Sequence, residues 1–251
     1  MWPVHTWLPD AHVEAPTGGS IILAAIMLKL GAYGFLRFSL PIAPDASHEL
    51  AGFVIALSLI AVVYIGFVAL VQSDMKKLVA YSSIAHAGYL FFALLGAGAG
   101  RAQAVIFYVV VYGIMNVLAF TVLPRGTDDE RSDRLESLQG LYQRRPFAAI
   151  MLAISMLSLA GLPPLPGFVA KFLVFRNVLA AGYTGYAVLG LVASYLGIYF
   201  YLRVIQYMFM NPATAGQPAG HPRRLALAAS LLCLVPAVVL AFFPGWLLDR
   251  F

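Results

Sequence analysis

Two of the chain's four lysines lie inside long apolar stretches, and an amine in such a place can carry protons. Lys29 lies near the middle of the apolar stretch 18–38, so a helix there would put it about 14 Å from either end at 1.5 Å per residue. A charge at the centre of a bilayer costs between about 2.5 and 17 kcal/mol, depending on the method of measurement. Such an amine is expected to face protein or water, where it takes up and releases a proton near neutral pH. A buried structural ion pair is the alternative for each lysine.

The other lysine, Lys171, follows a break rich in proline and glycine within the longest apolar stretch, residues 147–180. Proline cannot continue a helix without freeing carbonyl groups upstream of it. In lipid, such a break is tolerated only where it is buried in protein or lines a water-filled cavity, and broken helices recur at ion and substrate sites of transporters. The sequence therefore predicts a broken helix beside Lys171, against the alternatives of a simple kink or a helix–loop–helix at the interface. The residues of the break are Gly161, Pro163, Pro164, Pro166 and Gly167.

Polar residues enter two other apolar stretches at spacings that favour a proton relay. Tyr81, Ser82 and His86 form a polar stripe at the start of the stretch 78–98, and an imidazole can pass a proton between its two nitrogens. Tyr112 and Asn116 are four residues apart, so they share a face of a helix. These residues are predicted to line a proton path with the two lysines. A packing role for His86 and interhelical hydrogen bonding by Tyr112 and Asn116 are equally good accounts.

Four residues near the N-terminus have the side chains of metal ligands: His5, Asp10, His12 and Glu14. Their spacing matches no zinc-finger or helical ligand pattern, so no metal site is predicted. The single cysteine, Cys233, excludes a cysteine metal cluster and a disulfide framework. The sequence also has no nucleotide-binding glycine loop. We therefore expect no redox centre and no cofactor in this chain.

The composition indicates what must surround these residues. Hydrophobic residues make up 61% of the 251 positions and charged residues 11%, against about 25% charged in a soluble domain. The net charge of +5 comes from basic residues at the ends of apolar runs, which is typical of membrane topology signals rather than of nucleic-acid binding. The chain is therefore predicted to be an integral membrane protein that contacts the lipid bilayer and no nucleic acid.

Seven stretches are long enough to cross a hydrocarbon core about 30 Å thick, which needs roughly 20 apolar residues. All are expected to be helices, because unpaired backbone cannot stay in lipid. The predicted fold is all-α, a polytopic bundle of about seven transmembrane helices with one broken, in a single membrane domain over residues 1–251. Residues 1–17 are too short and polar to span and are expected to form a loop or half-helix. The predicted spans are approximately 18–38, 52–72, 78–98, 102–123, 147–180, 184–208 and 225–245.

Lysine and arginine are concentrated in alternate loops, which predicts the orientation in the membrane. The loop after the second span holds Lys76 and Lys77, whereas the loop 39–51 has no basic residue. The N-terminus is therefore expected on the cytoplasmic side of the cell inner membrane and the C-terminus outside. The other basic residues behind this prediction are Arg125, Arg131, Arg134, Arg144 and Arg145 after the fourth span, and Arg223 and Arg224 before the last.

The same motifs carry a resemblance to a known family. The run His5–Thr17, followed by Leu28–Gly34, resembles subunit M of the proton-pumping NADH–quinone oxidoreductase, respiratory complex I. The runs Leu78–Tyr89 and Leu159–Pro164 are more similar to subunit N of that complex. Both subunits belong to the antiporter-like family that is shared with multisubunit sodium/proton antiporters and membrane-bound hydrogenases. The resemblance extends over essentially the whole chain, M-like in the first third and N-like after it.

The resemblance implies roles for individual residues. Lys29 corresponds to the central lysine of the family's eighth helix, and Lys171 to the basic residue of its broken twelfth helix, where subunit M has a glutamate. Asp74, Lys76 and Lys77 match the short charged loop that precedes the tenth helix. The fourth span has Tyr112 where subunit M has a histidine.

By that resemblance, the chain would be a proton-translocating membrane subunit of a complex I-type enzyme, in which Lys29 passes a proton toward Lys171. Its partners would be the other membrane-arm subunits, and NADH, FMN, iron–sulfur clusters and quinone would be bound by partner subunits. The alternatives are a subunit of a sodium/proton antiporter or a membrane-bound hydrogenase, and a truncated structural remnant that does not pump. An intramembrane metalloenzyme that uses His5 and His12 is a further alternative.

The match covers the second half of the family's helices and the half-helix before them. The glutamate of the family's fifth helix and the lysine of its broken seventh helix have no counterpart in this sequence. A fragment, a split gene, and a hybrid of M-like and N-like sequence all remain open as explanations.

Overall fold

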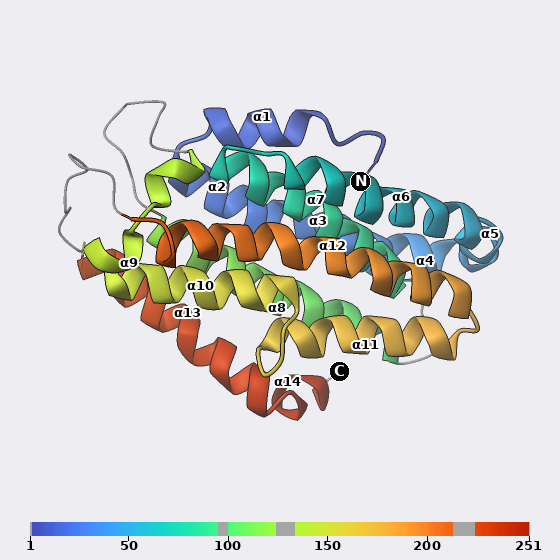
Figure 1. Cartoon of the computed structure of the whole chain (residues 1–251). Coiled ribbons are helices and arrows are strands. Elements are labelled where there is room, and N and C mark those ends of the chain that lie inside the picture. The colour runs from blue at the N-terminus through green and yellow to red at the C-terminus, as the bar shows by residue number, and fades with distance from the viewer. Residues whose placement is uncertain (1, 95–99, 124–133, 213–223, 251) are drawn as a thin grey trace.

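The computed structural model describes residues 2–94, 100–123, 134–212 and 224–250, and its regular structure there is helical (Figure 1). Within these residues the β-type pairing is limited to one isolated bridge between Asp74 and Arg134. Most of the long helices run side by side along one direction, as a membrane-crossing bundle requires. The predicted all-α class is confirmed. The loop residues Arg125, Arg131 and Arg223, and residues 95–98 of the third predicted span, lie outside the described residues.

The first span is a continuous helix of 26 residues, Thr17–Ile42, with two π-helical segments. One of these segments ends two residues before Lys29, and π-helical turns inside α-helices are frequent at functional sites. The span consists of α2 (Thr17–Ile22), η1 (Leu23–Met27, π-helical), α3 (Leu28–Gly34), η2 (Phe35–Ser39, π-helical) and α4 (Leu40–Ile42). The eight-residue helix α1 (Trp7–Glu14) precedes it and reaches only about 12 Å, too short to cross a bilayer.

Five helices within the described residues are long and apolar enough to cross a membrane. They are Thr17–Ile42, α6 (Ala51–Leu70), α8 (Gly100–Val122), α12 (Thr184–Phe209) and the Leu225–Phe242 part of α13 (Arg224–Phe242). Short helices lie in the connections and at the C-terminal end: α5 (Pro44–Glu49), η4 (Leu135–Leu138, a 3₁₀ turn), α9 (Leu141–Arg144) and α14 (Gly245–Leu248).

Helix α7 (Met75–Leu94) is also long, with 20 residues, but it is more polar than these five because it carries two lysines, two serines and a histidine. It lies inside the bundle, where 15 of its residues are buried and α1, α3, α6, α8 and α11 pack against it. Polar side chains inside a membrane must face other protein or water. The central position of α7 therefore follows from its composition.

The fifth predicted span is a broken helix, as the prolines and glycines predicted. Helix α10 (Pro146–Ala160) and helix α11 (Pro166–Ala180) each start with a proline, whose fixed φ suits the first turn of a helix. Gly161 ends α10 with φ of 86°, a left-handed conformation that a residue with a Cβ rarely adopts. A Cβ on Gly167 would lie 1.7 Å from the Ser158 carbonyl oxygen, so only glycine lets α11 start this close to the end of α10.

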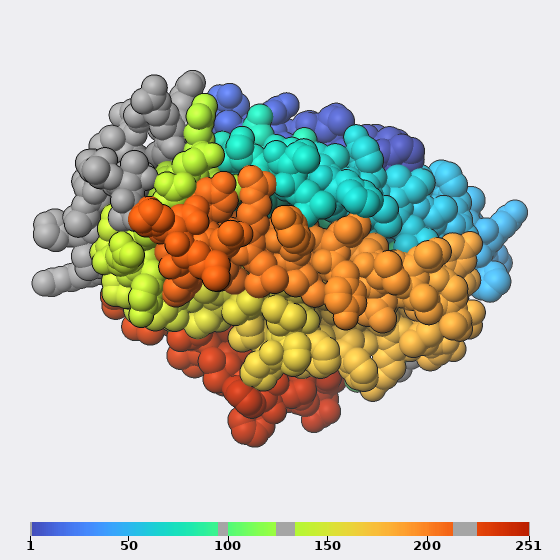
Figure 2. All heavy atoms as spheres, viewed as in Figure 1, coloured from blue at the N-terminus to red at the C-terminus, as the bar shows by residue number. Residues whose placement is uncertain are grey.

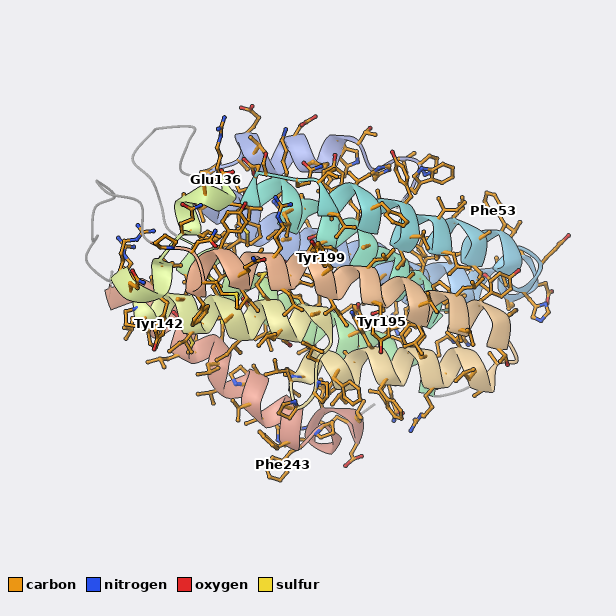
Figure 3. All side chains as sticks on the ribbon, viewed as in Figure 1. Phe53, Glu136, Tyr142, Tyr195, Tyr199 and Phe243 are labelled. Atoms are coloured by element: carbon orange, nitrogen blue, oxygen red, sulfur yellow. The ribbon has the colours of Figure 1, made fainter. Side chains whose placement is uncertain are left out.

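The outer surface of the bundle is apolar, as expected for a multi-pass integral membrane protein. Helix α12 crosses the middle of the face shown in Figure 2 and exposes large side chains along its length. Tyr195 and Tyr199 on α12 are 71% and 66% exposed, and with Phe53 and Phe243 they point away from the bundle (Figure 3). Large apolar side chains exposed over such an area indicate contact with lipid or with partner helices rather than with water.

Arginine side chains hydrogen-bond to backbone carbonyl groups of neighbouring segments at the basic end of the bundle. Arg203 on α12 donates hydrogen bonds to the carbonyl oxygens of Leu70 and Gln72, at 2.7 and 3.3 Å. It thereby binds the C-terminal carbonyl groups of α6, which have no partner within their own helix. Arg144 likewise donates to the carbonyl oxygen of Gln139 at 2.8 Å.

Candidate functional site

Lys29 lies inside the bundle with 5% of its surface exposed and is held by uncharged groups. Its Nζ donates a hydrogen bond to the carbonyl oxygen of Ala24 at 3.1 Å and lies 3.7 Å from the centroid of the Tyr112 ring. Ala24 belongs to the π-helical segment η1, so the side chain turns back along its own helix. Among the described residues no carboxylate pairs with Lys29, so the buried ion pair considered for it is not formed there.

Lys171 is 8% exposed and lies at the break between α10 and α11. Its Nζ donates to the carbonyl oxygen of Ala160 at 2.7 Å and to the Ser194 Oγ at 2.9 Å. Ala160 is the last residue of α10, so the ammonium group lies where the helix dipole is negative. Gly161 provides the space, because a Cβ there would lie 2.7 Å from the Lys171 Cδ. Lys171 also has no carboxylate partner within the part of the chain that the structure describes.

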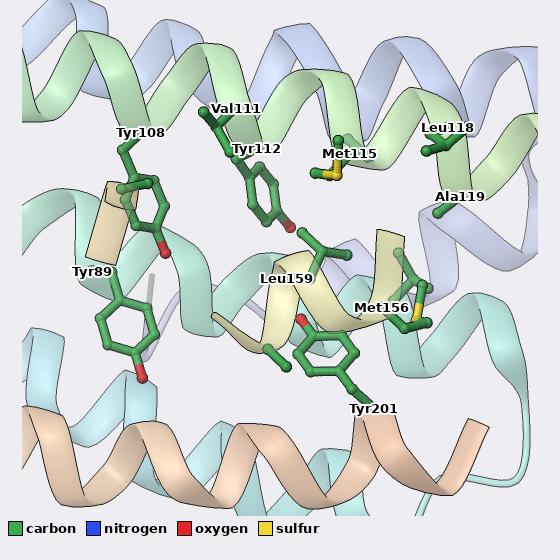
Figure 4. Close-up of a cluster of buried hydrophobic side chains, with 14 of the residues drawn as sticks. Tyr89, Tyr108, Val111, Tyr112, Met115, Leu118, Ala119, Met156, Leu159 and Tyr201 are labelled. Carbon is green, nitrogen blue, oxygen red and sulfur yellow. The ribbon is translucent and has the colours of Figure 1, made fainter. Parts of the chain in front are cut away.

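His86 lies between these two amines and is held by two tyrosines from different helices. Its Nδ1 is 2.6 Å from the hydroxyl of Tyr108 on α8, and its Nε2 is 3.0 Å from the hydroxyl of Tyr201 on α12. The Tyr201 hydroxyl also hydrogen-bonds the Ser82 Oγ. Tyr108 and Tyr201 reach into the core from opposite sides in Figure 4. A neutral imidazole can therefore donate from one nitrogen and accept at the other.

Tyr112 connects the surroundings of Lys29 to those of His86. Its ring contacts the His86 ring, with centroids 4.4 Å apart, and it also contacts the Lys29 ammonium described above. Its hydroxyl donates to the Ser83 Oγ at 2.8 Å. Asn116 donates from its side-chain nitrogen to the Tyr112 carbonyl oxygen at 2.8 Å, while its buried Oδ1 has no partner among the described residues.

Two small cavities separate His86 from Lys171, and both residues line both cavities. Tyr108, Tyr112 and Ser158 are in the wall of one, and Tyr89 and Tyr201 are in the wall of the other. Each has room for about one water molecule and offers it several polar partners. The two amines, the imidazole and the tyrosines thus form one buried cluster of titratable groups.

The structure brings together six of the seven residues predicted to line a path: Lys29, Ser82, His86, Tyr112, Asn116 and Lys171. Tyr81 lies elsewhere. It packs against the main apolar core and against a second, smaller cluster that includes Leu8 of α1 and Ile84. Since Tyr81 and His86 are five positions apart on a helix, their side chains point in different directions.

The N-terminal residues that resemble metal ligands do not converge. His5 is buried with its ring 6.3 Å from that of Tyr64, and the His12 ring lies 5.7 Å from that of Phe120. Asp10 and Glu14 are exposed. In the described ranges no three His, Cys, Asp or Glu residues form a group that could hold a metal ion.

Several residues of the cluster were missed by reasoning from the sequence: Tyr89, Tyr108, Tyr201, Ser83 and Ser194. Spacing could have found some of them. Tyr108 and Tyr112 are four apart, and Ser82, His86 and Tyr89 recur at intervals of four and three, which places each set on one helix face. Tyr201 and Ser194 have no such signal, because tyrosines occur on several faces of α12.

Comparison with known proteins gives consistent matches over this chain. A family profile described as "NADH:quinone oxidoreductase/Mrp antiporter, TM" matches residues 1–197. The NADH-quinone oxidoreductase subunit N of Pelobacter propionicus is 41% identical over 225 residues, which cover 87% of this chain and 47% of that protein. The NADH-quinone oxidoreductase subunit M of Rickettsia conorii is 38% identical over 250 residues, which cover 97% of this chain and 49% of that protein. The chain therefore spans about half the length of these curated relatives.

Solved structures give the same result for the fold. A chain of respiratory complex I from Thermus thermophilus with bound Aureothin superposes with a TM-score of 0.81 at 36% identity, covering 99% of this chain and 54% of that one. A chain of the Mrp complex from Dietzia superposes with a TM-score of 0.83 at 22% identity, covering 99% of this chain and 54% of that one. At this lower identity the likeness concerns the fold alone.

Proposed function

Because the chain belongs to the NADH:quinone oxidoreductase/Mrp antiporter transmembrane family, we propose that it is a proton-translocating membrane subunit of a NADH–quinone oxidoreductase-type complex. The names of its relatives, subunits M and N of NADH-quinone oxidoreductase, support the proposal. Its partners are then other membrane-arm subunits, which supply the energy. NADH, FMN, iron–sulfur clusters and quinone are bound by partner subunits, and this chain contributes the proton path.

One observation carries the proposal: two amines deep in the bundle have no carboxylate partner among the described residues, and an imidazole lies between them. In the proposed mechanism the Lys29 ammonium releases a proton to water beside Tyr112. His86 accepts a proton on one nitrogen and releases one from the other, toward the cavities that it shares with Lys171. The Lys171 amine accepts that proton and later releases it at the break of the helix.

Because both amines are surrounded by uncharged groups, each is expected to pass a proton on rather than keep it. In a low dielectric, like charges repel strongly, so a proton on Lys29 raises the free energy of a second proton on Lys171. A lysine that was paired with a carboxylate would instead keep its charge. The Ala160 carbonyl and the Ser194 hydroxyl stabilise the Lys171 ammonium by dipoles alone, which leaves it free to become neutral.

Proton flux into vesicles tests the proposal. The full chain would be reconstituted in liposomes that contain a pH-sensitive dye, and a potassium diffusion potential would drive protons inward. We expect Lys29→Ala and Lys171→Ala each to reduce the flux at least about tenfold, or about 1.4 kcal/mol in barrier. The matched control is Arg37→Ala in the first span, because this arginine is an exposed cation on the same segment as Lys29.

Two results would contradict the proposal. If both lysine variants conduct like the wild type while their assembly with partner subunits fails, the chain is a structural remnant. If no variant and not even the wild type exceeds empty liposomes, the chain conducts nothing by itself and the proposed path is wrong for this chain.

Sodium/proton antiport is a second candidate, because the description of the matched family also names the Mrp antiporter. The same vesicles separate the two functions. A sodium gradient that drives proton movement without an imposed potential would support antiport, whereas proton flux that is indifferent to sodium supports the respiratory function.

A further inference from the structure

One side of helix α11 carries two exposed aromatic rings followed by an exposed arginine. Phe168, Phe172 and Arg176 recur at intervals of four residues, so they lie in a row along the helix. Phe168 is 40% exposed and Phe172 54%, and their rings stack with centroids 6.2 Å apart. Lys171, on the same helix, is buried. The row therefore belongs to the outer surface of the bundle and not to the cluster around His86.

The length of this row matches one leaflet of a bilayer. Helices α10 and α11 follow one another along the bundle, so the break between them and the nearby Phe168 lie near mid-depth (Figure 1). Arg176 is eight residues farther along α11, or about 12 Å at 1.5 Å per residue. The hydrocarbon of one leaflet is about 15 Å thick, half of the roughly 30 Å core. A phospholipid with an acyl chain along the two rings would therefore have its headgroup at the guanidinium.

A second arginine lies near Arg176 at this end of the bundle. Asn177 of α11 donates its side-chain amide to the carbonyl oxygen of Gly100, the first residue of α8, at 2.6 Å. Arg176 and Arg101 are the chain neighbours of these two residues, so both cations flank this contact. Within the described residues, neither guanidinium has a hydrogen bond or an ion pair.

This pair of cations favours an anion as the bound group. Two like charges repel one another most strongly where the dielectric is low, so an anion beside both of them stabilises the end of α11. Guanidinium groups bind phosphate through paired hydrogen bonds. The carboxylate of Asp249 also lies near the first turn of α8, where Gln103 donates to the Leu248 carbonyl oxygen, but Arg250 follows it and offsets its charge.

A transmembrane helix of a partner subunit is the other candidate for this apolar face. Such a helix would have to bring a carboxylate to the arginines at the boundary of the membrane, where it would compete with the bilayer. An anionic phospholipid presents its phosphate at this depth beside every exposed helix. The position of the arginine at the end of the apolar row therefore favours a lipid.

We propose that the outer face of α11 binds one anionic phospholipid, with an acyl chain along Phe168 and Phe172 and its phosphate at Arg176 and Arg101. The proposal goes beyond the proposed function, because the lipid lies on the outer surface and takes no part in a proton step.

Thermal unfolding with added lipid tests the proposal. The purified full chain in a neutral detergent would be titrated with phosphatidylglycerol and, in parallel, with phosphatidylcholine that has the same acyl chains. We expect phosphatidylglycerol to raise the melting temperature until the site is saturated, because a ligand that binds only the native state stabilises it by mass action. Phosphatidylcholine should raise it much less. Native mass spectrometry should detect one phosphatidylglycerol on each chain.

Variants of the arginine locate the site. Arg176→Ala should need at least about tenfold more phosphatidylglycerol for the same shift, because its charge-assisted bonds to the phosphate are lost. Arg176→Lys keeps the charge without the planar fork and should be intermediate. The matched control is Arg37→Ala, an exposed arginine of the first span, which should be titrated like the wild type.

Several results would overturn the proposal. Equal stabilisation by the two lipids, or an unchanged titration of Arg176→Ala, would mean that Arg176 does not bind the headgroup. An equal loss in Arg37→Ala would mean that the lipid responds to net charge and not to this face. Equal stabilisation by glycerol phosphate, which has the charge without an acyl chain, would reduce the site to one for small anions.

Cross-linking in native membranes separates a lipid from a partner subunit. A photoreactive group on Phe172→Cys, with Cys233 replaced by serine, should capture phospholipid. Capture of a partner's transmembrane helix would assign the face to a protein interface and overturn the proposal. None of these measurements uses proton flux, so failure of this inference leaves the proposed function untouched.

Discussion

The two buried lysines are held by groups that carry no full charge, and this decides what they can do. Removing one partner of a buried ion pair leaves an uncompensated charge, which costs about 3–5 kcal/mol. Lys29 contacts a carbonyl oxygen and an aromatic ring, and Lys171 contacts a helix end and a hydroxyl. Neither lysine therefore leaves an unpaired charge behind when it loses a proton. Such surroundings permit an amine to change its charge in place.

The Tyr201 hydroxyl hydrogen-bonds both His86 and Ser82. Tyr201→Phe removes only that hydroxyl and leaves one imidazole nitrogen without its partner. We expect proton flux to fall about tenfold, equivalent to about 1.4 kcal/mol, with little change in fold. The measurement is flux in vesicles, in H₂O and in D₂O, where a larger isotope effect in the variant would show that proton transfer has become limiting.

The control for this variant is Tyr199→Phe on the same helix, because that side chain is exposed and lies outside the cluster. Equal losses in the two variants would mean that α12 had shifted as a whole. Unchanged flux in Tyr201→Phe would remove Tyr201 from the path.

Burial of His12 on α1 lowers its pKa, and this predicts how stability depends on pH. The folded pKa is about 4 and that of an exposed histidine is about 6.5, so the unfolded chain binds a proton first as the pH falls. The contribution of His12 to stability is therefore complete above pH 6.5 and is lost between pH 6.5 and about 4. Melting temperatures in detergent should fall more steeply over this range for the wild type than for His12→Phe, with a difference of about 5 °C at the acid end. Parallel curves would show that His12 is not buried in its neutral form.

Lys29, Lys171 and His86 could be identified from the sequence, because each stands out in an apolar stretch. Tyr201 and Ser194 could not. Helix α12 is apolar with tyrosines on several faces, so its inward face is set by the helices that pack on it and not by its own pattern. The five-residue spacing of Tyr81 and His86 already places the two side chains on different faces of α7, and the structure puts Tyr81 beside Leu8 of α1.

At the scale of the elements, the break between α10 and α11 is the feature that positions Lys171. Gly167→Ala tests it, because the added Cβ would strike a backbone oxygen that cannot move alone. We expect a loss of about 3 kcal/mol in stability and a loss of flux, since α11 must move away from Ser158 and take Lys171 with it. Thermal unfolding in detergent and vesicle flux measure the two effects.

Gly185→Ala is the matched control for this prediction, because nothing lies within 4 Å of the added Cβ at the start of α12. It should be neutral or slightly stabilising. A Gly167→Ala variant as stable as the wild type would show that the two half-helices are not packed this closely.

The helices themselves were predictable from apolar length, and the broken one from its prolines and glycines. The π-helical segments around Lys29 were not, because nothing in Leu23–Met27 differs in composition from an ordinary α-helix. Helix α8 packs closely against the first of them, where a Cβ on Gly113 would come within 3.3 Å of the Ala25 carbonyl oxygen. The span predicted at 78–98 corresponds to α7, whose serines and histidine lie inside the bundle against neighbouring helices.

At the scale of the whole molecule, the bundle has an apolar outer surface and one basic end. The large exposed apolar side chains of α6, α12 and α13 surround the buried cluster, which agrees with a path insulated from lipid by protein. The basic end carries Lys76, Lys77 and Arg144.

The distribution of basic residues predicts that the Lys76 end faces the cytoplasm, because cytoplasmic loops carry an excess of lysine and arginine. Cysteine labelling on intact cells would test this, after Cys233, the only cysteine, is replaced by serine. His48→Cys and Ser73→Cys place one exposed thiol in each of two consecutive loops. A membrane-impermeant maleimide should label His48→Cys before the cells are opened and Ser73→Cys only afterwards. The reverse pattern would put the basic end outside and would contradict the predicted orientation.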